Sequence, residues 1–111
     1  MMKNLTFEEV QLIEEVYNYE KPHKEYYRIS KTMVEIGVVD ATLAKLLNEE
    51  FNLYLKEKVK LNPIGAYTDK TNFKCEYYQK EGLLYQYGYN DNNEVCIILI
   101  CKKKNEFKYQ N

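Results

Sequence analysis

The sequence predicts an α+β domain in which three N-terminal helices pack on one face of a C-terminal antiparallel meander of three to four strands. Over residues 1–60 apolar side chains recur at helical spacing, whereas over residues 61–111 they alternate with polar ones. Turn-forming residues separate the alternating runs. At 111 residues the chain is long enough to bury one core, so residues 1–111 are expected to form a single domain with a helical half and a meander half.

A capping box predicts where the first helix begins. Thr6 is followed three residues later by Glu9, and Leu5 and Val10 flank this pair as a hydrophobic staple. Apolar residues then recur on one stripe until the pattern ends before Pro22.

A second helix is expected over residues 22–36, because Pro22 suits a first turn and Gly37 can supply a left-handed C-terminal cap. A charged outer face of such a helix is usually solvated, and contact with an acidic partner is its functional alternative. The basic patch on this predicted helix consists of Lys21, Lys24, Arg28 and Lys31.

Asp40 is expected to cap a third helix that runs to about Val59, because leucines and aromatic residues form a broad apolar face between them. Pro63 and Gly65 then end the helical periodicity, and residues of strand-like composition follow.

The second half of the chain alternates apolar and polar side chains with a period of two, which is typical of strands that bury one face. Gly82 is expected to close a three-residue loop, and residues 90–93 supply the next turn. The expected strands are residues 64–68, 73–79, 83–89 and 94–102.

Loop length decides which side chains share a face of this sheet. With a three-residue loop before Leu83, Tyr77 lies opposite Tyr85. Tyr87 then lies opposite Cys96, whether the next connection is a two-residue turn or a four-residue loop. This register places most tyrosines of the meander on the face that the helices cover. The opposite face carries the residues from which we predict a protein interface: Tyr78, Leu84, Gln86, Val95, Ile97 and Leu99.

That opposite face needs a cover, because the last strand is apolar on both sides. Four covers are alternatives: the first helix wrapping round the sheet, a C-terminal segment with Phe107 and Tyr109, a second copy of the chain, or another protein.

Composition argues against several classes of partner. Lys and Arg number 16 against 17 Asp and Glu, so the whole chain has no net charge that would attract nucleic acid or acidic lipid. The longest apolar run is too short to cross a bilayer, and the start lacks a secretory apolar segment. We therefore expect a cytoplasmic protein without membrane association.

Residues with catalytic potential do not form a recognisable set. The single histidine, His23, lies among lysines next to a proline, and the sequence has no glycine-rich phosphate loop. Cys75, Cys96 and Cys101 are expected to be free thiols in a reducing compartment, because their number is odd and they have no CxxC spacing. We expect no metal, no cofactor and no enzymatic activity.

The function predicted from the sequence is therefore a small non-enzymatic domain that acts by protein–protein contact. It would be a homodimer, or a regulator, inhibitor or immunity-type factor such as a phage or mobile element carries. The alternative is a winged-helix-like DNA-binding regulator, in which the second and third helices form a helix-turn-helix. The start of the third helix has at least as many acids as bases, which disfavours contact with phosphates.

Overall fold

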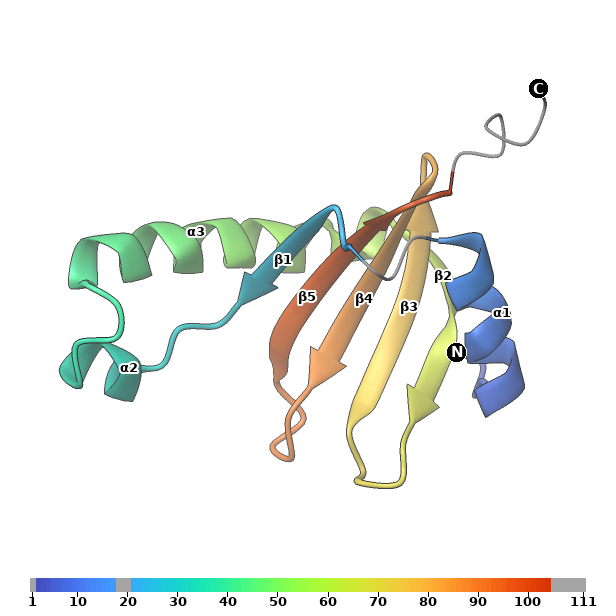
Figure 1. The fold of residues 1–111 in the computed structure, drawn as a ribbon, viewed down its shortest axis with the longest axis horizontal. Helices are drawn as coiled ribbons and strands as arrows, with labels where there is room; N and C mark the ends of the chain where they lie inside the picture. The colour runs from blue at the N-terminus through green and yellow to red at the C-terminus, as the bar shows by residue number, and fades with distance from the viewer. Residues whose placement is uncertain (1, 18–20, 105–111) are drawn as a thin grey trace.

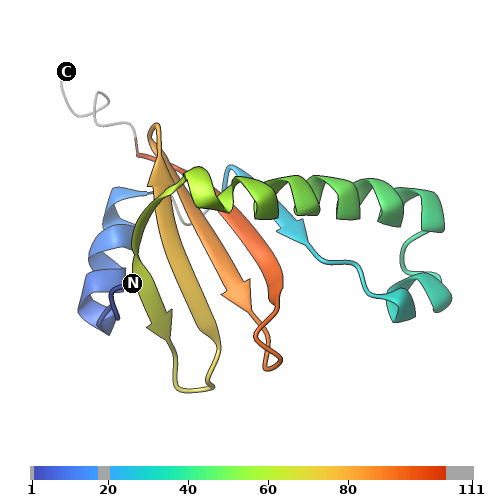
Figure 2. The ribbon, with the colours of Figure 1, turned by 180° about the vertical axis from the view of Figure 1, so that it is seen from behind.

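The structure is a computed structural model that describes residues 2–17 and 21–104. They form a five-stranded antiparallel sheet with helices on both of its faces (Figures 1 and 2). The strand order is β1-β5-β4-β3-β2, so β1 and β2 are the edges. The α+β class and the antiparallel sheet are confirmed, whereas the prediction of only three to four strands is wrong.

Four strands of the meander lie within two residues of their predicted bounds, and β4 has them unchanged. The elements in chain order are α1 (Phe7–Val16), β1 (Lys24–Tyr27), α2 (Lys31–Glu35), α3 (Ala41–Glu57), the 3-10 turn η1 (Lys58–Lys60), β2 (Asn62–Thr68), β3 (Lys74–Lys80), β4 (Leu83–Tyr89) and β5 (Val95–Lys102).

The two long helices begin where the sequence predicts. The Thr6 hydroxyl accepts a hydrogen bond from the Glu9 backbone N–H, and the Glu9 carboxylate accepts one from the Thr6 N–H, which completes the capping box of α1. The Asp40 carboxylate accepts a hydrogen bond from the Leu43 N–H at the start of α3. These caps are local, since each needs only residues three apart.

The predicted helix over residues 22–36 is wrong. Its first half contains the edge strand β1, and only the five residues of α2 are helical. In β1, Tyr26 lies opposite Ile98 and is buried. Pairing with β5 satisfies backbone groups that would otherwise form an open apolar edge, and this outweighs the weak helical preference of two adjacent tyrosines.

The helices do not all pack on one face of the sheet. Phe51 of α3 shares a buried cluster with Tyr87, whereas Val10 of α1 shares a second cluster with Leu84 and Cys101 on the opposite face (Figures 1 and 2). Strands β4 and β5 are apolar on both sides, so both sides need a cover. Of the four predicted covers, the first helix is the one that the described residues show; Phe107 and Tyr109 lie outside them.

The first hairpin has a two-residue turn instead of the predicted three-residue loop. Lys80 pairs with Leu83, whereas Gln79 was expected to do so. Glu81 and Gly82 have φ values of 52° and 78°, the left-handed conformations that a tight hairpin turn of this length requires.

This change of one residue exchanges the two faces of β3. Glu76 now lies opposite Tyr87, and Tyr78 joins the same face. Cys75 and Tyr77 move to the face that α1 covers. Because side chains alternate along a strand, a slip of one residue moves every side chain of that strand to the other face.

The second hairpin differs from the prediction by two residues. Tyr87 lies opposite Ile98 instead of Cys96. The loop spans residues 90–94, one more than the longer predicted loop, and Cys96 is an extra residue in a bulge. The longer loop shifts the pairing by one residue, and the bulge shifts it by one more. The two shifts together restore the alternation, so Ile98 lies on the same face of the sheet as Tyr87.

The packing of α1 on the sheet can be tested by truncating one leucine that is buried under α1 and one leucine of α1 that faces solvent. Leu84→Ala is expected to lower the free energy of unfolding by about 2–5 kcal/mol, because the Leu84 side chain is fully buried and leaves a cavity. The matched control Leu12→Ala, at a leucine that is 61% exposed in α1, is expected to change it by less than about 0.5 kcal/mol. Urea unfolding followed by circular dichroism measures both, and equal losses would contradict the packing of α1 on Leu84.

Candidate protein-interaction site

The structure places the residues of the predicted interface in three different environments. Tyr78 is buried on the face that α3 covers. Leu84 and Gln86 are buried in the middle of the sheet. Val95 packs against the α3 side because of the bulge beside it, and only Ile97 and Leu99 remain half-buried on the predicted face. The one-residue change in the first hairpin and the cover by α1 explain these differences.

The predicted basic patch is not a helical stripe, because the strand β1 and the short helix α2 replace the single helix that would carry it. Lys24 lies in β1, and Arg28 is the first residue after that strand. The guanidinium group of Arg28 lies 3.7 Å from the Glu94 carboxylate and 5.4 Å from the centre of the Phe51 ring. Lys31 begins α2 and forms an ion pair with Glu35, and Lys21 is exposed. Of the helix pair in the DNA-binding alternative, the second helix is shortened to the five residues of α2, and α3 follows it after a short connection.

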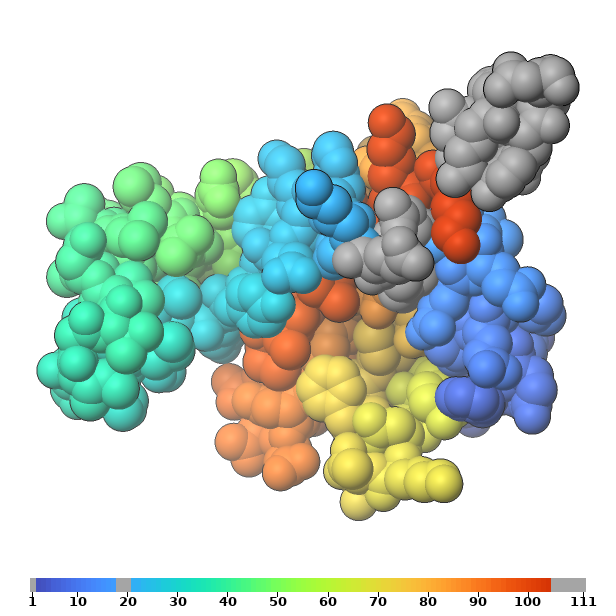
Figure 3. Space-filling model, in the orientation of Figure 1, coloured from blue at the N-terminus to red at the C-terminus, as the bar shows by residue number. Residues whose placement is uncertain are grey.

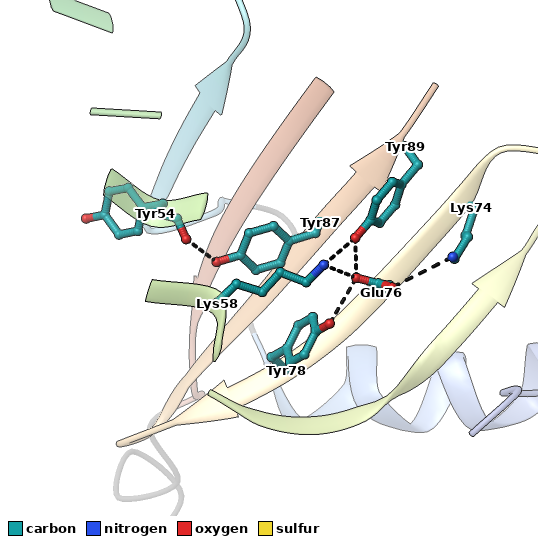
Figure 4. A network of polar contacts seen from close by, with 7 residues as sticks. All are labelled: Tyr54, Lys58, Lys74, Glu76, Tyr78, Tyr87 and Tyr89. Atoms are coloured by element: carbon teal, nitrogen blue, oxygen red, sulfur yellow. Dashed lines mark hydrogen bonds and ion pairs between the residues drawn. The ribbon is translucent and has the colours of Figure 1, made fainter. Parts of the chain in front are cut away.

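A buried carboxylate, Glu76 of β3, connects the sheet to the end of the helical half (Figure 4). Its Oε1 accepts a hydrogen bond from the Tyr78 hydroxyl at 2.9 Å and another from the Tyr89 hydroxyl, and the Lys58 ammonium lies 2.7 Å away. Lys74 approaches the other oxygen at 3.7 Å. The Glu76 side chain is 11% exposed, so most of its hydrogen-bonding capacity is met inside the protein.

The surroundings of Glu76 keep it ionised. Burial opposes the charge, but the hydrogen bonds from Lys58, Tyr89 and Tyr78 outweigh burial and lower the pKa of Glu76. Burial and the hydrogen bonds to the carboxylate raise the pKa of Tyr78 and of Tyr89, so both hydroxyls remain donors at neutral pH. The cluster is a satisfied ion pair that holds η1 against β3.

The thiols of the chain are poor nucleophiles at neutral pH. Burial raises the pKa of Cys75 to about 12, and it also raises the pKa of Cys96 and of Cys101. Among the residues that the structure describes, no three His, Cys, Asp or Glu side chains are placed to hold a metal ion.

A pocket of about 500 Å³ adjoins the Glu76 cluster, and its lining is mainly apolar. Lys58 is its charged member, and that ammonium is already engaged by Glu76. Sequence reasoning missed both the cluster and this pocket. A two-residue turn at Glu81-Gly82 would have predicted the register that places Glu76 and Tyr89 on the same face of the sheet. The pocket is lined by Met2, Leu55, Lys58, Val59, Leu61, Pro63 and Tyr78.

Helix α2 and the first turns of α3 project beyond the edge of the sheet (Figures 1 and 3), and we refer to α2 and the whole of α3 as the arm. Ala44 and Phe51 are the buried residues of α3, and they share one side of the helix. The exposed part of the α3 surface carries further apolar residues. Sequence reasoning placed some of these on the apolar face of the helix and did not single out the others. The arm surface, as we name it, consists of Ile36, Val38, Leu43, Leu46 and Leu53, which are 68%, 61%, 46%, 55% and 59% exposed.

Comparison with other proteins does not assign a function to this surface. No protein-family model, curated protein or solved structure matches the chain. None of the described helices has the length and apolar character needed to cross a bilayer. The exposed apolar side chains of the arm are the feature of the surface that most favours binding of a partner.

The hydrogen bond from Tyr89 to Glu76 can be measured with a matched pair of tyrosines. Tyr89→Phe is expected to lower the free energy of unfolding by about 1.5–3 kcal/mol, the usual contribution of a hydrogen bond to a charged group. Tyr85 is equally buried but takes no part in the cluster, so Tyr85→Phe is expected to cost less than about 0.5 kcal/mol. Similar losses in the two variants, measured by urea unfolding, would show that the hydroxyl of Tyr89 contributes little.

The charge of Glu76 predicts a pH dependence of stability. The folded protein lowers the pKa of Glu76 below its ordinary value of 4.5, so the unfolded chain binds a proton at this residue more readily. The ionised carboxylate therefore stabilises the fold above about pH 4.5, and this contribution is lost as the pH falls further.

Glu76→Gln is accordingly expected to be about 1–3 kcal/mol less stable than the natural chain at pH 7. The difference should shrink below about pH 4.5, where the natural side chain gains a proton. Unfolding free energies measured from pH 7 to pH 3 test this, and a difference that stays constant over that range would rule out the ionised cluster.

Proposed function

We propose that the protein is a non-enzymatic protein-binding domain that contacts its partner through the arm surface. The observation that carries the proposal is the exposure of that surface: each of its five apolar side chains is at least 46% exposed. Exposed apolar residues gathered on one projecting element are typical of interaction sites, whereas single ones scattered over a surface are ordinary.

The free energy gained by burying the arm surface can be compared with the cost of association. Fully burying an aliphatic side chain contributes roughly 1.5–3 kcal/mol, so five side chains that are about half exposed could still gain on the order of 4–7 kcal/mol. Association costs an estimated 4–15 kcal/mol in lost freedom. The apolar contacts therefore offset only the lower end of that cost, and stable binding also needs charged or hydrogen-bonded contacts.

The arm is held firmly at its C-terminal end, which favours a preformed binding surface. The Tyr87 hydroxyl donates a hydrogen bond to the Tyr54 backbone carbonyl of α3 at 2.8 Å, and Phe51 is 1% exposed beneath the same helix. Lys58, the first residue after α3, is bound to Glu76 of the sheet. A surface already fixed in position loses less conformational entropy when a partner binds.

Site-specific photo-crosslinking tests this proposal with the full chain in extract of its own cells. The crosslinking residue p-benzoylphenylalanine replaces Leu46 of the arm or, as the control, Leu12 of α1, which is similarly exposed at 61% compared with 55%. A discrete crosslinked product is expected from position 46 and not from position 12. It should weaken when Leu53→Asn is added, because the apolar contact is then interrupted.

The mass of the product distinguishes the kinds of partner. Twice the mass of the chain identifies a homodimer, which light scattering of the pure protein then checks, and another discrete mass identifies a different protein. No product at position 46, or equal products at both positions, would reject the arm as the binding surface.

A further inference from the structure

We propose that the arm binds an amphipathic helix of a partner protein that carries Lys or Arg side chains opposite Glu50 and Glu57 of α3. This inference rests on the proposed function and deepens it by naming the chemistry of the partner. It is carried by the spacing of side chains on α3 and by a groove between α3 and β1.

The exposed side of α3 has the spacing of a helix-packing seam. Its side chains follow one another by three and four residues, which is the repeat that aligns one helix along another. Leucines hold three of the five positions and are 46%, 55% and 59% exposed, so the seam has no cover within the described residues. The seam consists of Leu43, Leu46, Glu50, Leu53 and Glu57.

The two glutamates of the seam also line a groove of about 190 Å³. Pockets for whole small molecules are usually about 300–1,000 Å³, so a groove of this size suits a single long side chain. Strand β1 forms its other wall. The complete lining is Lys24, Tyr26, Glu50, Leu53, Tyr54 and Glu57.

The groove favours a cation. Among the described residues, neither Glu50 nor Glu57 belongs to an ion pair, and Lys24 is paired with neither of them. Two carboxylates against one ammonium leave the groove with a net negative charge. The rings of Tyr26 and Tyr54, whose centres are 4.6 Å apart, add aromatic surface on which a guanidinium or ammonium group can pack.

The same seam on a second copy of the chain does not supply the required charge. If two α3 helices packed through this seam in parallel, Glu50 would meet Glu50 and Glu57 would meet Glu57. An antiparallel pair centred on Glu50 also brings two Glu50 side chains together, and other registers place a carboxylate against a leucine or against another carboxylate. Each arrangement buries charge without a partner, which costs stability, whereas a basic helix turns the same charges into attraction.

Two synthetic helical peptides test the inference. Both are fluorescently labelled, three heptads long, and carry leucines along one stripe. Two positions of that stripe, seven residues apart, are arginine in the first peptide and glutamate in the second. Fluorescence anisotropy with the full chain measures the Kd of each peptide. The arginine peptide is expected to bind at least about tenfold more tightly than the glutamate peptide, and its advantage should decrease as salt is added.

Charge reversal in the protein supplies the matched comparison. The double variant Glu50→Lys, Glu57→Lys is expected to reverse the preference between the two peptides. The control Glu49→Lys, at an exposed position outside the seam, should leave the preference unchanged. Leu46→Asn is expected to weaken both peptides. Circular dichroism and thermal unfolding identify any variant that has lost its fold, and Glu50→Gln with Glu57→Gln then serves as the milder replacement.

The outcomes separate this inference from the proposed function. Absence of binding, equal binding of the two peptides, or a preference that charge reversal leaves unchanged would overturn the basic-helix inference. If the crosslink at position 46 is nevertheless found, protein binding through the arm stands and the partner has different chemistry. If that crosslink is also absent, both proposals fall.

Discussion

The buried carboxylate of Glu76 is the interaction on which the arrangement of the two halves depends. Lys58 comes directly after α3, while Tyr78 and Tyr89 come from two neighbouring strands, and all three groups meet at this one side chain (Figure 4). A carboxylate in such a place is costly unless several donors compensate for the lost water. Because its donors come from different elements, the compensation exists only when α3 is seated on the sheet, and the seat of α3 fixes the direction of the arm.

Helix α3 serves two purposes with different sides of its surface. Phe51 and its neighbours complete the core on one face of the sheet, while the leucines of the arm surface remain outside it. The sheet face from which a protein interface was predicted is instead partly covered by α1. This division moves the proposed site of protein contact from the sheet to the arm. There, apolar side chains lie on the same helix as two carboxylates that form no ion pair with any described residue.

A hairpin turn shows how sensitive the site is to a small local choice. A loop of three residues and a turn of two both fit the sequence before Leu83, and each gives a sheet with alternating faces. Only the shorter turn brings Glu76 to the side of Tyr89, where Lys58 can reach both. The energetic difference between the two registers lies in side-chain packing and in the buried ion pair, which depend on residues distant in sequence.

The sequence by itself determined the elements whose signals lie within a few residues: the capped starts of α1 and α3, the approximate bounds of the meander strands, and the antiparallel order of β2 to β5. Tertiary structure decided that Lys24–Tyr27 pairs with β5 as a strand, that α1 and α3 cover opposite faces, and which leucines of α3 stay exposed. Caps and alternation are satisfied locally, so they can be recognised from spacing. The partner of a strand or of a helix face is chosen by competition among distant segments for the same apolar surface, and spacing along the chain does not reveal which segment wins.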